Sequence, residues 1–339
     1  MVKVAISGYY GFNNFGDEAI LSVLINKLKF LNAKITVFSS NPKFSEKNYA
    51  VKAIKRFDFF KILFTLLETD ILISGGGSLL QDVTSMKSLL YYSFLIFLAL
   101  LFKKKVIIFA QGIGPLNNKI SKIIVRYLLK RVDYVSVRDE KSYKLMKKYK
   151  INAELVCDPI YSINVSKAIK SGVVGVQLRN FATMNYGLLT KLAEHIVINF
   201  SDKKIEIYSF QNSIDLDICK KFLGILRTLN PDIDAEVISS KPLKETIERI
   251  SNLEYLIAMR FHAILVALMA GVKTCAINYD IKVERIADEA KIPIISMNAE
   301  EDLKNIFKNL EQLQQANILK FAQSKQFNWE NFEKIINAK

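Results

Sequence analysis

The sequence predicts an α/β protein made of two Rossmann-like domains. Short apolar segments, each long enough for one strand, alternate with longer segments whose apolar residues recur at helical spacing. Several of the strand segments end in glycine or in a charged residue, as strands of doubly wound parallel sheets do. The pattern pauses in a polar stretch at 162–171 and then begins again. We therefore expect two α/β domains that face one another across a cleft.

The first domain, residues 1–161, contains five predicted strands. These apolar segments occupy 2–7, 35–39, 70–74, 106–110 and 134–137. A helix is predicted from Asp17, because one helical face carries the apolar residues Ile20, Leu21, Leu24, Ile25 and Leu28.

The second domain, residues 172–310, repeats the pattern with strands at 173–178, 205–209, 235–238, 255–258 and 274–277. The remaining residues, 311–339, read as a helical tail that is able to pack back on the first domain.

An apolar segment at 89–102 is followed by three lysines at 103–105. Its length is too short to span a bilayer, which takes about 20 residues. A buried crossover helix is the favoured interpretation. The alternative is a helix that lies on a membrane surface, with the lysines against anionic headgroups.

The chain has 339 residues and a net charge of +15. Such an excess favours acidic partners, such as anionic lipid or a phosphorylated substrate, although a generally lysine-rich composition explains it equally well. No nucleic-acid-binding motif accompanies the charge, so we expect no nucleic acid partner.

The cysteines and the N-terminus predict a cytoplasmic protein. Cys157, Cys219 and Cys275 are far apart and form no CxxC pair, which argues against disulfides and zinc. The chain passes directly into its first strand, so we expect no signal peptide.

Glycine-rich loops follow two strands of the first domain. The loop at 8–16 delivers a helix whose first turn holds Asp17 and Glu18, so sugar hydroxyls are expected there rather than a free phosphate. Gly75, Gly76 and Gly77 would let a ligand or another backbone approach closely.

The segment from Met259 to His262 joins a strand to an apolar helix. Arg260 has the planar fork that binds carboxylate or phosphate, and His262 is suited to proton transfer near neutral pH. In the other interpretation, His262 caps the helix and Arg260 pairs with a nearby acid. The second histidine, His195, lies in an apolar helix and is expected to be structural.

Two acidic residues, Asp215 and Asp217, superficially resemble a metal-binding DxD motif. Acidic residues at the start of a predicted helix are the simpler explanation, so we expect no metal site.

Seven segments, in order, resemble the polysaccharide pyruvyltransferase family. They are GYYGFNNFGDEAIL, ISGGGSLLQDVTSMKSLLYY, QGIGPL, VRDEKS, CDP, MRFHAILVALMAGV and NYDIKV. Within that family the chain resembles the CsaB-type enzymes of bacterial cell-wall polysaccharide, and the resemblance covers most of its length.

The resemblance implies a GT-B-like fold and transfer of a pyruvyl group from phosphoenolpyruvate to a sugar. In CsaB-type enzymes the acceptor is a lipid-linked saccharide that contains N-acetylmannosamine, and the product is a 4,6-pyruvate ketal that anchors S-layer homology domains. No metal or organic cofactor is implied. A lipid-linked acceptor also makes peripheral contact with the inner face of the cell membrane a reasonable expectation.

The same resemblance, together with the predicted strand ends, assigns roles to individual residues. His262 is the candidate general acid and Arg260 its catalytic partner. The donor-binding candidates are Arg138, Arg179, Lys282, Gly75, Gly76 and Gly77. The acceptor-binding candidates are Tyr9, Asn13, Asp17 and Glu18.

Two other functions stay open. A GT-B glycosyltransferase with a nucleotide-sugar donor would share the cleft, the glycine loops and the cationic second half. A non-catalytic protein that binds phosphate or lipid-linked saccharide could use the same scaffold.

Overall fold

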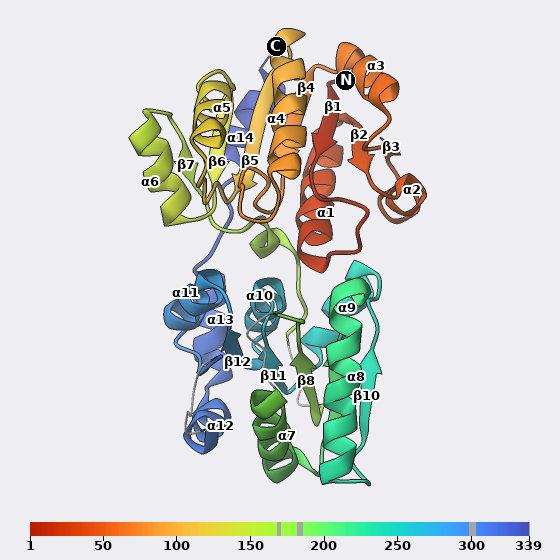
Figure 1. Cartoon of the computed structure of the whole chain (residues 1–339), viewed down its shortest axis with the longest axis vertical. Helices are drawn as coiled ribbons and strands as arrows, with labels where there is room; N and C mark the ends of the chain where they lie inside the picture. The colour runs from red at the N-terminus through yellow and green to blue at the C-terminus, as the bar shows by residue number, and fades with distance from the viewer. Residues whose placement is uncertain (168–170, 182–185, 298–302, 339) are drawn as a thin grey trace. The chain divides into compact units, whose positions relative to one another are not determined.

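The computed structural model describes residues 1–167, 171–181, 186–297 and 303–338. The chain divides into two compact units (Figure 1). Unit 1 comprises Met1–Ile163 and Gln326–Lys339, and unit 2 comprises Asn164–Lys325. Outside the described residues lie 168–170 of the predicted linker, 182–185 and 298–302 of the predicted second domain, and the last residue of the predicted tail.

Unit 1 contains a seven-stranded parallel sheet in the order β3-β2-β1-β4-β5-β6-β7. Its strands are β1 (Lys3–Ser7), β2 (Lys34–Ser39), β3 (Lys52–Lys55), β4 (Ile71–Gly75), β5 (Lys105–Gln111), β6 (Tyr134–Val137) and β7 (Glu154–Leu155). The direction of chain progression reverses between β1 and β4. Ligands of open α/β sheets bind at such a reversal, outside the carboxyl ends of the strands.

Helices cover both faces of this sheet (Figure 1). Successive residues of β1 point to opposite faces, Val4 and Ile6 to one and Ala5 to the other. The first face packs on α1 (Phe15–Phe30) and α14 (Glu330–Asn337). The second packs on α3 (Phe59–Glu68), α4 (Met86–Leu101), α5 (Lys119–Leu129) and α6 (Glu140–Tyr149). Helix α2 (Pro42–Tyr49) lies beside β2 and β3, and the short η1 (Pro159–Ser162) lies against α1.

The apolar segment at 89–102 forms most of α4, the crossover between β4 and β5, but only one side of it is buried. Leu89, Leu95 and Ile96 pack into the core, whereas Phe94 and Phe97 are 43% and 44% exposed. The predicted crossover is confirmed, but the expectation that the helix is buried is wrong for the side that carries Phe94 and Phe97. No described helix is both long enough and apolar enough to cross a bilayer.

The end of the chain returns to unit 1. Phe327, Trp329 and Phe332 surround Phe109 of β5, with ring centroids 5.2 to 5.6 Å from it. Helices α12 (Leu303–Gln312) and α13 (Gln315–Gln323) belong to unit 2. Of the predicted tail at 311–339, only the part from Gln326 onward belongs to unit 1.

Unit 2 contains a six-stranded parallel sheet in the order β10-β9-β8-β11-β12-β13. Its strands are β8 (Val173–Gln177), β9 (Lys204–Tyr208), β10 (Ala235–Ile238), β11 (Tyr255–Ala258), β12 (Lys273–Asn278) and β13 (Ile294–Ser296). Helices α7 (Tyr186–Phe200), α8 (Asn212–Leu229) and α12 pack on one face. The opposite face of the sheet is covered by α9 (Leu243–Ser251), α10 (Phe261–Ala270), α11 (Ile281–Ala290) and α13. Helix α10 contacts each of α9, α11 and α13. Chain progression reverses between β8 and β11, so unit 2 has a switch point of its own.

Candidate functional site

Four of the predicted site residues follow three adjacent strands of unit 2. Arg179 follows β8, Arg260 and His262 follow β11, and Lys282 follows β12. The three strands are parallel and pair in the order β8-β11-β12. The structure therefore brings these four residues to the carboxyl edge of the sheet at its switch point, which is where ligands of α/β sheets bind.

Arg260 is held by a buried carboxylate. Its Nε and Nη2 atoms donate hydrogen bonds to Asp215 over 2.9 to 3.0 Å, and the two side chains are 10% and 0% exposed. Asp215 also accepts the backbone N–H groups of Phe210 and Gln211, which anchor it in the first turn of α8. Pairing with a nearby acid, the second interpretation of Arg260, is the arrangement observed. One edge of the guanidinium is thus occupied within unit 2.

The two acids of the DxD-like segment have different surroundings. Asp215 is buried against Arg260, whereas Asp217 is largely exposed and pairs with Lys221 one turn along α8. Nowhere in the described part of the chain do three or more His, Cys, Asp and Glu side chains gather as a metal site.

Arg179 has a different environment from Arg260. Its Nη1 donates to the Tyr279 hydroxyl at 3.4 Å, and its guanidinium carbon lies 5.5 Å from the centre of the same ring. Within the described residues, its Nε has no hydrogen-bond partner and no carboxylate lies within 4 Å of the side chain. Arg179 is thus the arginine of this edge whose charge the described residues leave without a counter-ion.

His262 is the second residue of α10, and Arg260 is the N-cap residue. His262 is therefore not the cap that one interpretation expected. The Arg260 side chain makes no capping hydrogen bond, so the positive end of α10 is left without a side-chain cap. The His262 ring is half-buried and lies 5.2 Å from that of Phe261. Lys282 has the equivalent position in α11, where Asp280 accepts its backbone N–H.

The acidic residues of the first glycine loop are engaged within unit 1. Glu18 accepts the backbone N–H of Gly11 at 2.7 Å and the hydroxyl of Tyr49 at 2.6 Å. Asn14 donates to Asp17 at 2.6 Å. Both carboxylates are buried, and burial raises the pKa of Glu18 above its ordinary value. These two acceptor candidates therefore help to shape the loop.

The glycines after β4 are required by the packing around them. The Tyr10 hydroxyl donates to the carbonyl of Gly75 at 2.6 Å. Gly76 and Gly77 have φ values of +82° and +59°, and a Cβ on Gly77 would lie 2.5 Å from Asp17 Oδ1. The structure thus gives these residues a local reason to be glycine that involves no ligand.

Tyr9 and Asn13 lie in the same loop. The Tyr9 ring stacks on Phe12 with centroids 4.1 Å apart, and Asn13 is exposed. Phe12 is also 5.2 Å from the guanidinium of Arg56, which follows β3. Arg56 is only 6% exposed and has no carboxylate within 4 Å among the described residues. The rings of Phe57, Tyr91 and Tyr92 complete its surroundings, at 4.5 to 5.5 Å.

Arg138, the donor candidate of unit 1, is also paired. Its Nη1 donates to Asp158 at 2.6 Å, and both side chains are buried. Asp158 also accepts the backbone N–H of Ile160 in η1. Arg138 therefore joins the end of β6 to η1.

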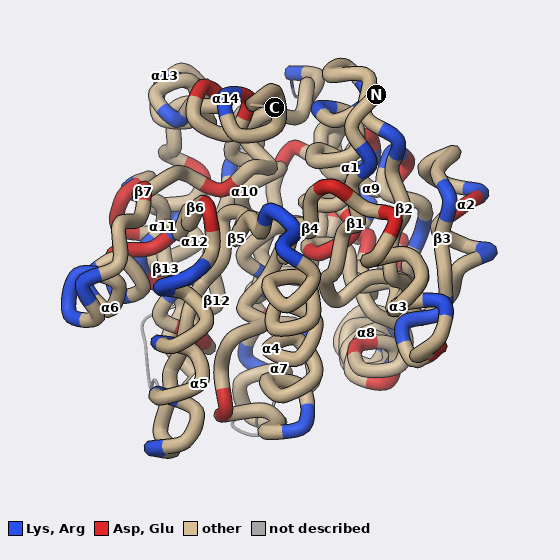
Figure 2. The backbone as a smooth tube through the Cα atoms, turned by 90° about the horizontal axis from the view of Figure 1, so that it is seen from above, with Lys and Arg blue, Asp and Glu red and all other residues tan. Residues whose placement is uncertain are grey.

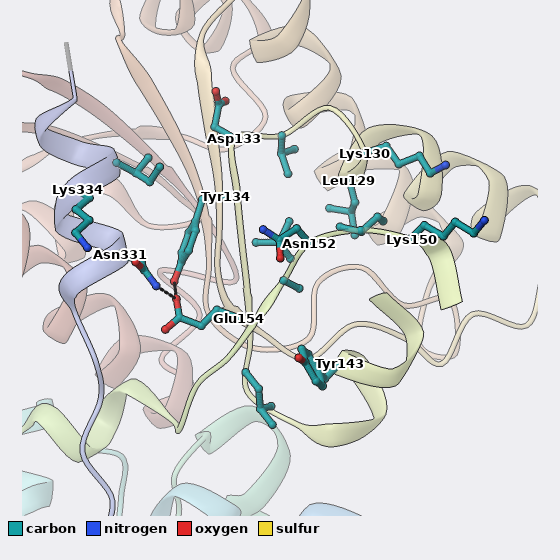
Figure 3. Close-up of a pocket in the computed structure, with 16 residues that line it drawn as sticks. Leu129, Lys130, Asp133, Tyr134, Tyr143, Lys150, Asn152, Glu154, Asn331 and Lys334 are labelled. Atoms are coloured by element: carbon teal, nitrogen blue, oxygen red, sulfur yellow. Dashed lines mark hydrogen bonds between the residues drawn. The ribbon is translucent and has the colours of Figure 1, made fainter. Parts of the chain in front are cut away.

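One hollow of unit 1, with a volume of about 870 Å³, is not at the switch point (Figure 3). It is lined by the first residues of β6 and β7, by the residues that precede these strands, by Tyr143 of α6 and by α14. Figure 3 shows Tyr134 and Asn331 both pointing to Glu154, to which they donate at 2.5 and 3.0 Å. Because ligands of parallel sheets bind at the opposite, carboxyl ends of strands, we do not assign the active site to this hollow.

Residues 14–281 match the family model described as polysaccharide pyruvyl transferase. The chain belongs to the polysaccharide pyruvyl transferase family. It is therefore a transferase, and the family implies a pyruvate donor and a polysaccharide acceptor. Of the candidate residues, Tyr9, Asn13 and Lys282 lie outside the matched segment. No curated protein shows significant sequence similarity to the chain.

Solved structures confirm the predicted GT-B-like fold of this family member. Anabaena Alr3699/HepE, in a complex with UDP and glucose, matches with a TM-score of 0.65 and 12% identity, over 99% of this chain and 98% of that one. A glycosyltransferase from Rickettsia africae matches with a TM-score of 0.64 and 13% identity, over 99% of both chains. The UDP-GlcNAc 2-epimerase of Methanocaldococcus jannaschii matches with a TM-score of 0.60 and 11% identity, over 96% of this chain and 94% of that one.

Three further residues of the candidate site become apparent from the structure. Asp215 orients Arg260, and Tyr279 lies against Arg179. Buried Gln177 accepts the backbone N–H of Arg260 at 2.7 Å and thereby links the ends of β8 and β11. The acidic character of the DxD-like segment was a sequence signal for Asp215, and Tyr279 lies in the segment NYDIKV, whereas none of the seven segments includes Gln177.

Proposed function

We propose that the protein transfers the pyruvyl group of phosphoenolpyruvate to a sugar of a lipid-linked cell-wall precursor, forming a 4,6-pyruvate ketal and releasing phosphate. The observation that carries the proposal is the family match across 14–281, which includes Arg179, Arg260 and His262. As in CsaB-type enzymes, the acceptor in this proposal contains N-acetylmannosamine. The site of action is the cytoplasmic face of the membrane, where the enzyme is peripheral, and the ketal serves to anchor S-layer proteins.

In the proposed reaction a proton is added to the methylene carbon of phosphoenolpyruvate while a sugar hydroxyl attacks the adjacent carbon. The C–O bond to phosphate then breaks, and a second hydroxyl of the same sugar closes the ketal. Of the two hydroxyl protons, one restores the acid and the other leaves with phosphate. His262, half-buried at the start of α10, is the proposed general acid.

The donor carries a carboxylate and a phosphate, so its site needs cations. We assign the most direct contact to Arg179, because the described residues provide it with no counter-ion. Lys282 and the uncapped end of α10 supply further positive charge. The Asp215 pair supports a positioning role for Arg260, and the Asp158 pair supports the same for Arg138.

The acceptor is assigned to the loop that follows β1. Tyr9 and Asn13 offer an aromatic face and an exposed amide, which suit a sugar ring and its hydroxyls. Asp17 and Glu18 hold the shape of the loop, and Gly75, Gly76 and Gly77 allow the close packing beneath it.

The proposal is tested by phosphate release from phosphoenolpyruvate, with and without a synthetic N-acetylmannosamine-containing lipid diphosphate, followed by NMR of the ketal methyl group. Acceptor-dependent release with a new ketal is the expected result. Replacing His262 by Ala should lower turnover by about a hundredfold or more. The control is His195→Ala, because His195 of α7 packs near Phe307 of α12 and has no assigned role.

The experiment also separates the alternatives. A protein that binds a nucleoside diphosphate and not phosphoenolpyruvate would be a nucleotide-sugar glycosyltransferase, an activity for which the structural likeness supports only the fold. A protein that binds donor and acceptor equally well before and after His262→Ala, and releases no phosphate, would be a binding protein.

A further inference from the structure

An exposed apolar surface runs along α4 of unit 1. Leu90, Phe94, Phe97 and Leu101 recur at spacings of four, three and four residues, which aligns them in one stripe. Each is 43% to 60% exposed. The stripe lies opposite the residues that α4 buries against the sheet, so it contributes nothing to the described core.

The neighbouring helices extend this stripe. Helix α4 contacts both α3 and α5. On α3, Phe60 and Phe64 are largely exposed, and on α5 so are Ile123 and Tyr127. We call the surface formed by Phe60, Phe64, Phe94, Phe97, Ile123 and Tyr127 the apolar face. A contiguous exposed surface of this kind, built from large side chains of three helices, marks an interaction site.

The apolar face contains a groove between α4 and α5. Its volume is about 320 Å³, and Phe94 and Phe97 line it from one side while Ile123 and Tyr127 line it from the other. The lining is almost entirely apolar, which suits hydrocarbon rather than a polar ligand.

The charge on α4 and α5 has a single sign, whereas α3 carries Lys61 and Glu68 and is capped by Asp58. The chain from 83 to 132, which includes all of α4 and α5, has nine Lys and Arg residues and no Asp or Glu. Lys87, Lys103, Lys119 and Lys122 of this segment are exposed. In Figure 2 the tubes of α4 and α5 correspondingly carry blue and no red. An apolar surface with a cationic border is complementary to anionic lipid headgroups above acyl chains.

We propose that the apolar face docks the protein on an anionic lipid bilayer. The exposed phenylalanines enter the boundary between headgroups and acyl chains, and the lysines lie against lipid phosphates. A second copy of the chain is a poorer occupant, because a symmetric contact through this face would bring two cationic borders together.

The apolar face is connected to the proposed acceptor loop. Tyr91 of α4 donates to the carbonyl of Arg56 at 2.7 Å, and the Arg56 guanidinium lies near Phe12, which stacks on Tyr9. Docking would therefore bring the bilayer surface next to the loop that we assign to a lipid-linked acceptor. This consequence rests on the proposed function, whereas docking itself does not.

The test is sedimentation of the full chain with vesicles of phosphatidylcholine, with and without phosphatidylglycerol. We expect binding to the anionic vesicles that weakens as salt is raised. The double variant Phe94→Gln/Phe97→Gln should bind the anionic vesicles with an affinity lower by about tenfold or more, because two half-exposed aromatic rings no longer enter the lipid. Its control is Ile198→Gln, an exposed apolar residue of α7 in unit 2.

The charge contribution is tested separately. Lys119→Gln/Lys122→Gln on α5 should weaken binding about fivefold or more for each lysine. Lys43→Gln/Lys47→Gln on α2 removes the same charge away from the apolar face and should have less effect. Absent binding, equal binding to neutral vesicles, or equal loss in test and control variants would overturn the proposal. Concentration-dependent dimers that Phe94→Gln/Phe97→Gln abolishes would identify a second copy as the occupant.

Should the phenylalanine variant unfold, hydrogen exchange of the wild-type chain decides the question. Slower exchange of the backbone amides of α4 and α5 on addition of anionic vesicles supports the proposal. Unchanged exchange of these amides contradicts it. These measurements involve neither phosphoenolpyruvate nor acceptor, so their failure is distinct from failure of the proposed reaction.

Discussion

Arg260 and Asp215 form a buried, two-pronged ion pair that joins the end of β11 to the first turn of α8. The carboxylate is fully buried and also accepts two backbone N–H groups, so it is fixed independently of its partner. The pair determines which way Arg260 points, two positions before His262, the proposed general acid.

Replacing Asp215 by Ala leaves a buried guanidinium without its counter-ion. Removing one partner of a buried pair typically lowers the free energy of unfolding by about 3–5 kcal/mol. Asp217→Ala, on the same helix, removes an exposed pair with Lys221 and should change it by no more than about 0.5 kcal/mol. Urea unfolding monitored by circular dichroism measures both. Similar small effects for the two variants would show that Arg260 does not depend on Asp215.

Arg56 offers a second prediction about a buried cation. Its surroundings are four aromatic rings rather than an acid. Arg56→Gln removes the charge that these ring faces stabilise, and we expect a loss of about 1–2 kcal/mol in the free energy of unfolding. The control is Lys55→Gln, because Lys55 is exposed and adjacent in sequence. Equal stabilities of the two variants would mean that the rings pack as well around a neutral side chain.

Glu18 should make stability depend on pH. Burial raises its pKa above the ordinary value of 4.5, so the folded protein binds the proton more tightly than the unfolded chain. The resulting stabilisation is complete below that ordinary value and is lost as pH rises through the raised pKa. Glu18→Gln lacks this titration, so its stability relative to wild type should improve from pH 4 toward neutrality.

Asp58 provides a control of opposite sign for the Glu18 prediction. Hydrogen bonds from Lys61 lower the pKa of Asp58. The ionised Asp58 therefore contributes to the free energy of unfolding at neutral pH, and this contribution is lost as pH falls through the lowered pKa. Denaturant titrations of Glu18→Gln from pH 4 toward neutrality, and of Asp58→Asn at pH values below 3.8, the ordinary pKa of an aspartate, should therefore give opposite slopes relative to wild type. Parallel slopes would contradict the environment assigned to Glu18.

The interior strands were predictable from the sequence because each is an apolar run followed by a turn or helix signal. Of the four edge strands, only β10 (Ala235–Ile238) was predicted, and β3, β7 and β13 were not. β3 is four residues with an exposed lysine at each end, β7 has two residues, and β13 has three. Such segments carry too little apolar pattern to stand out, and they become strands because a neighbouring strand offers its free edge.

The placement of the unit 2 residues was predictable for a related reason. A residue that directly follows a buried parallel strand must lie at the carboxyl edge of the sheet, and Arg179, Arg260 and His262 all do so. What the sequence could not reveal is which cation is already neutralised. Asp215 is 45 residues from Arg260, and only the packing of α8 against the sheet brings them together.

Arg179 is therefore the residue whose replacement should affect donor binding most directly. Arg179→Gln removes a charge that the described residues leave without a counter-ion, so loss of a charged hydrogen bond of about 1.5–3 kcal/mol should raise the KM for phosphoenolpyruvate by about tenfold to a hundredfold. Tyr279→Phe is the matched control, because it keeps the ring 5.5 Å from the guanidinium and removes only the hydroxyl. Steady-state phosphate release with varied donor distinguishes them. A raised KM for the acceptor alone, or none for Arg179→Gln, would assign the donor anion to other cations.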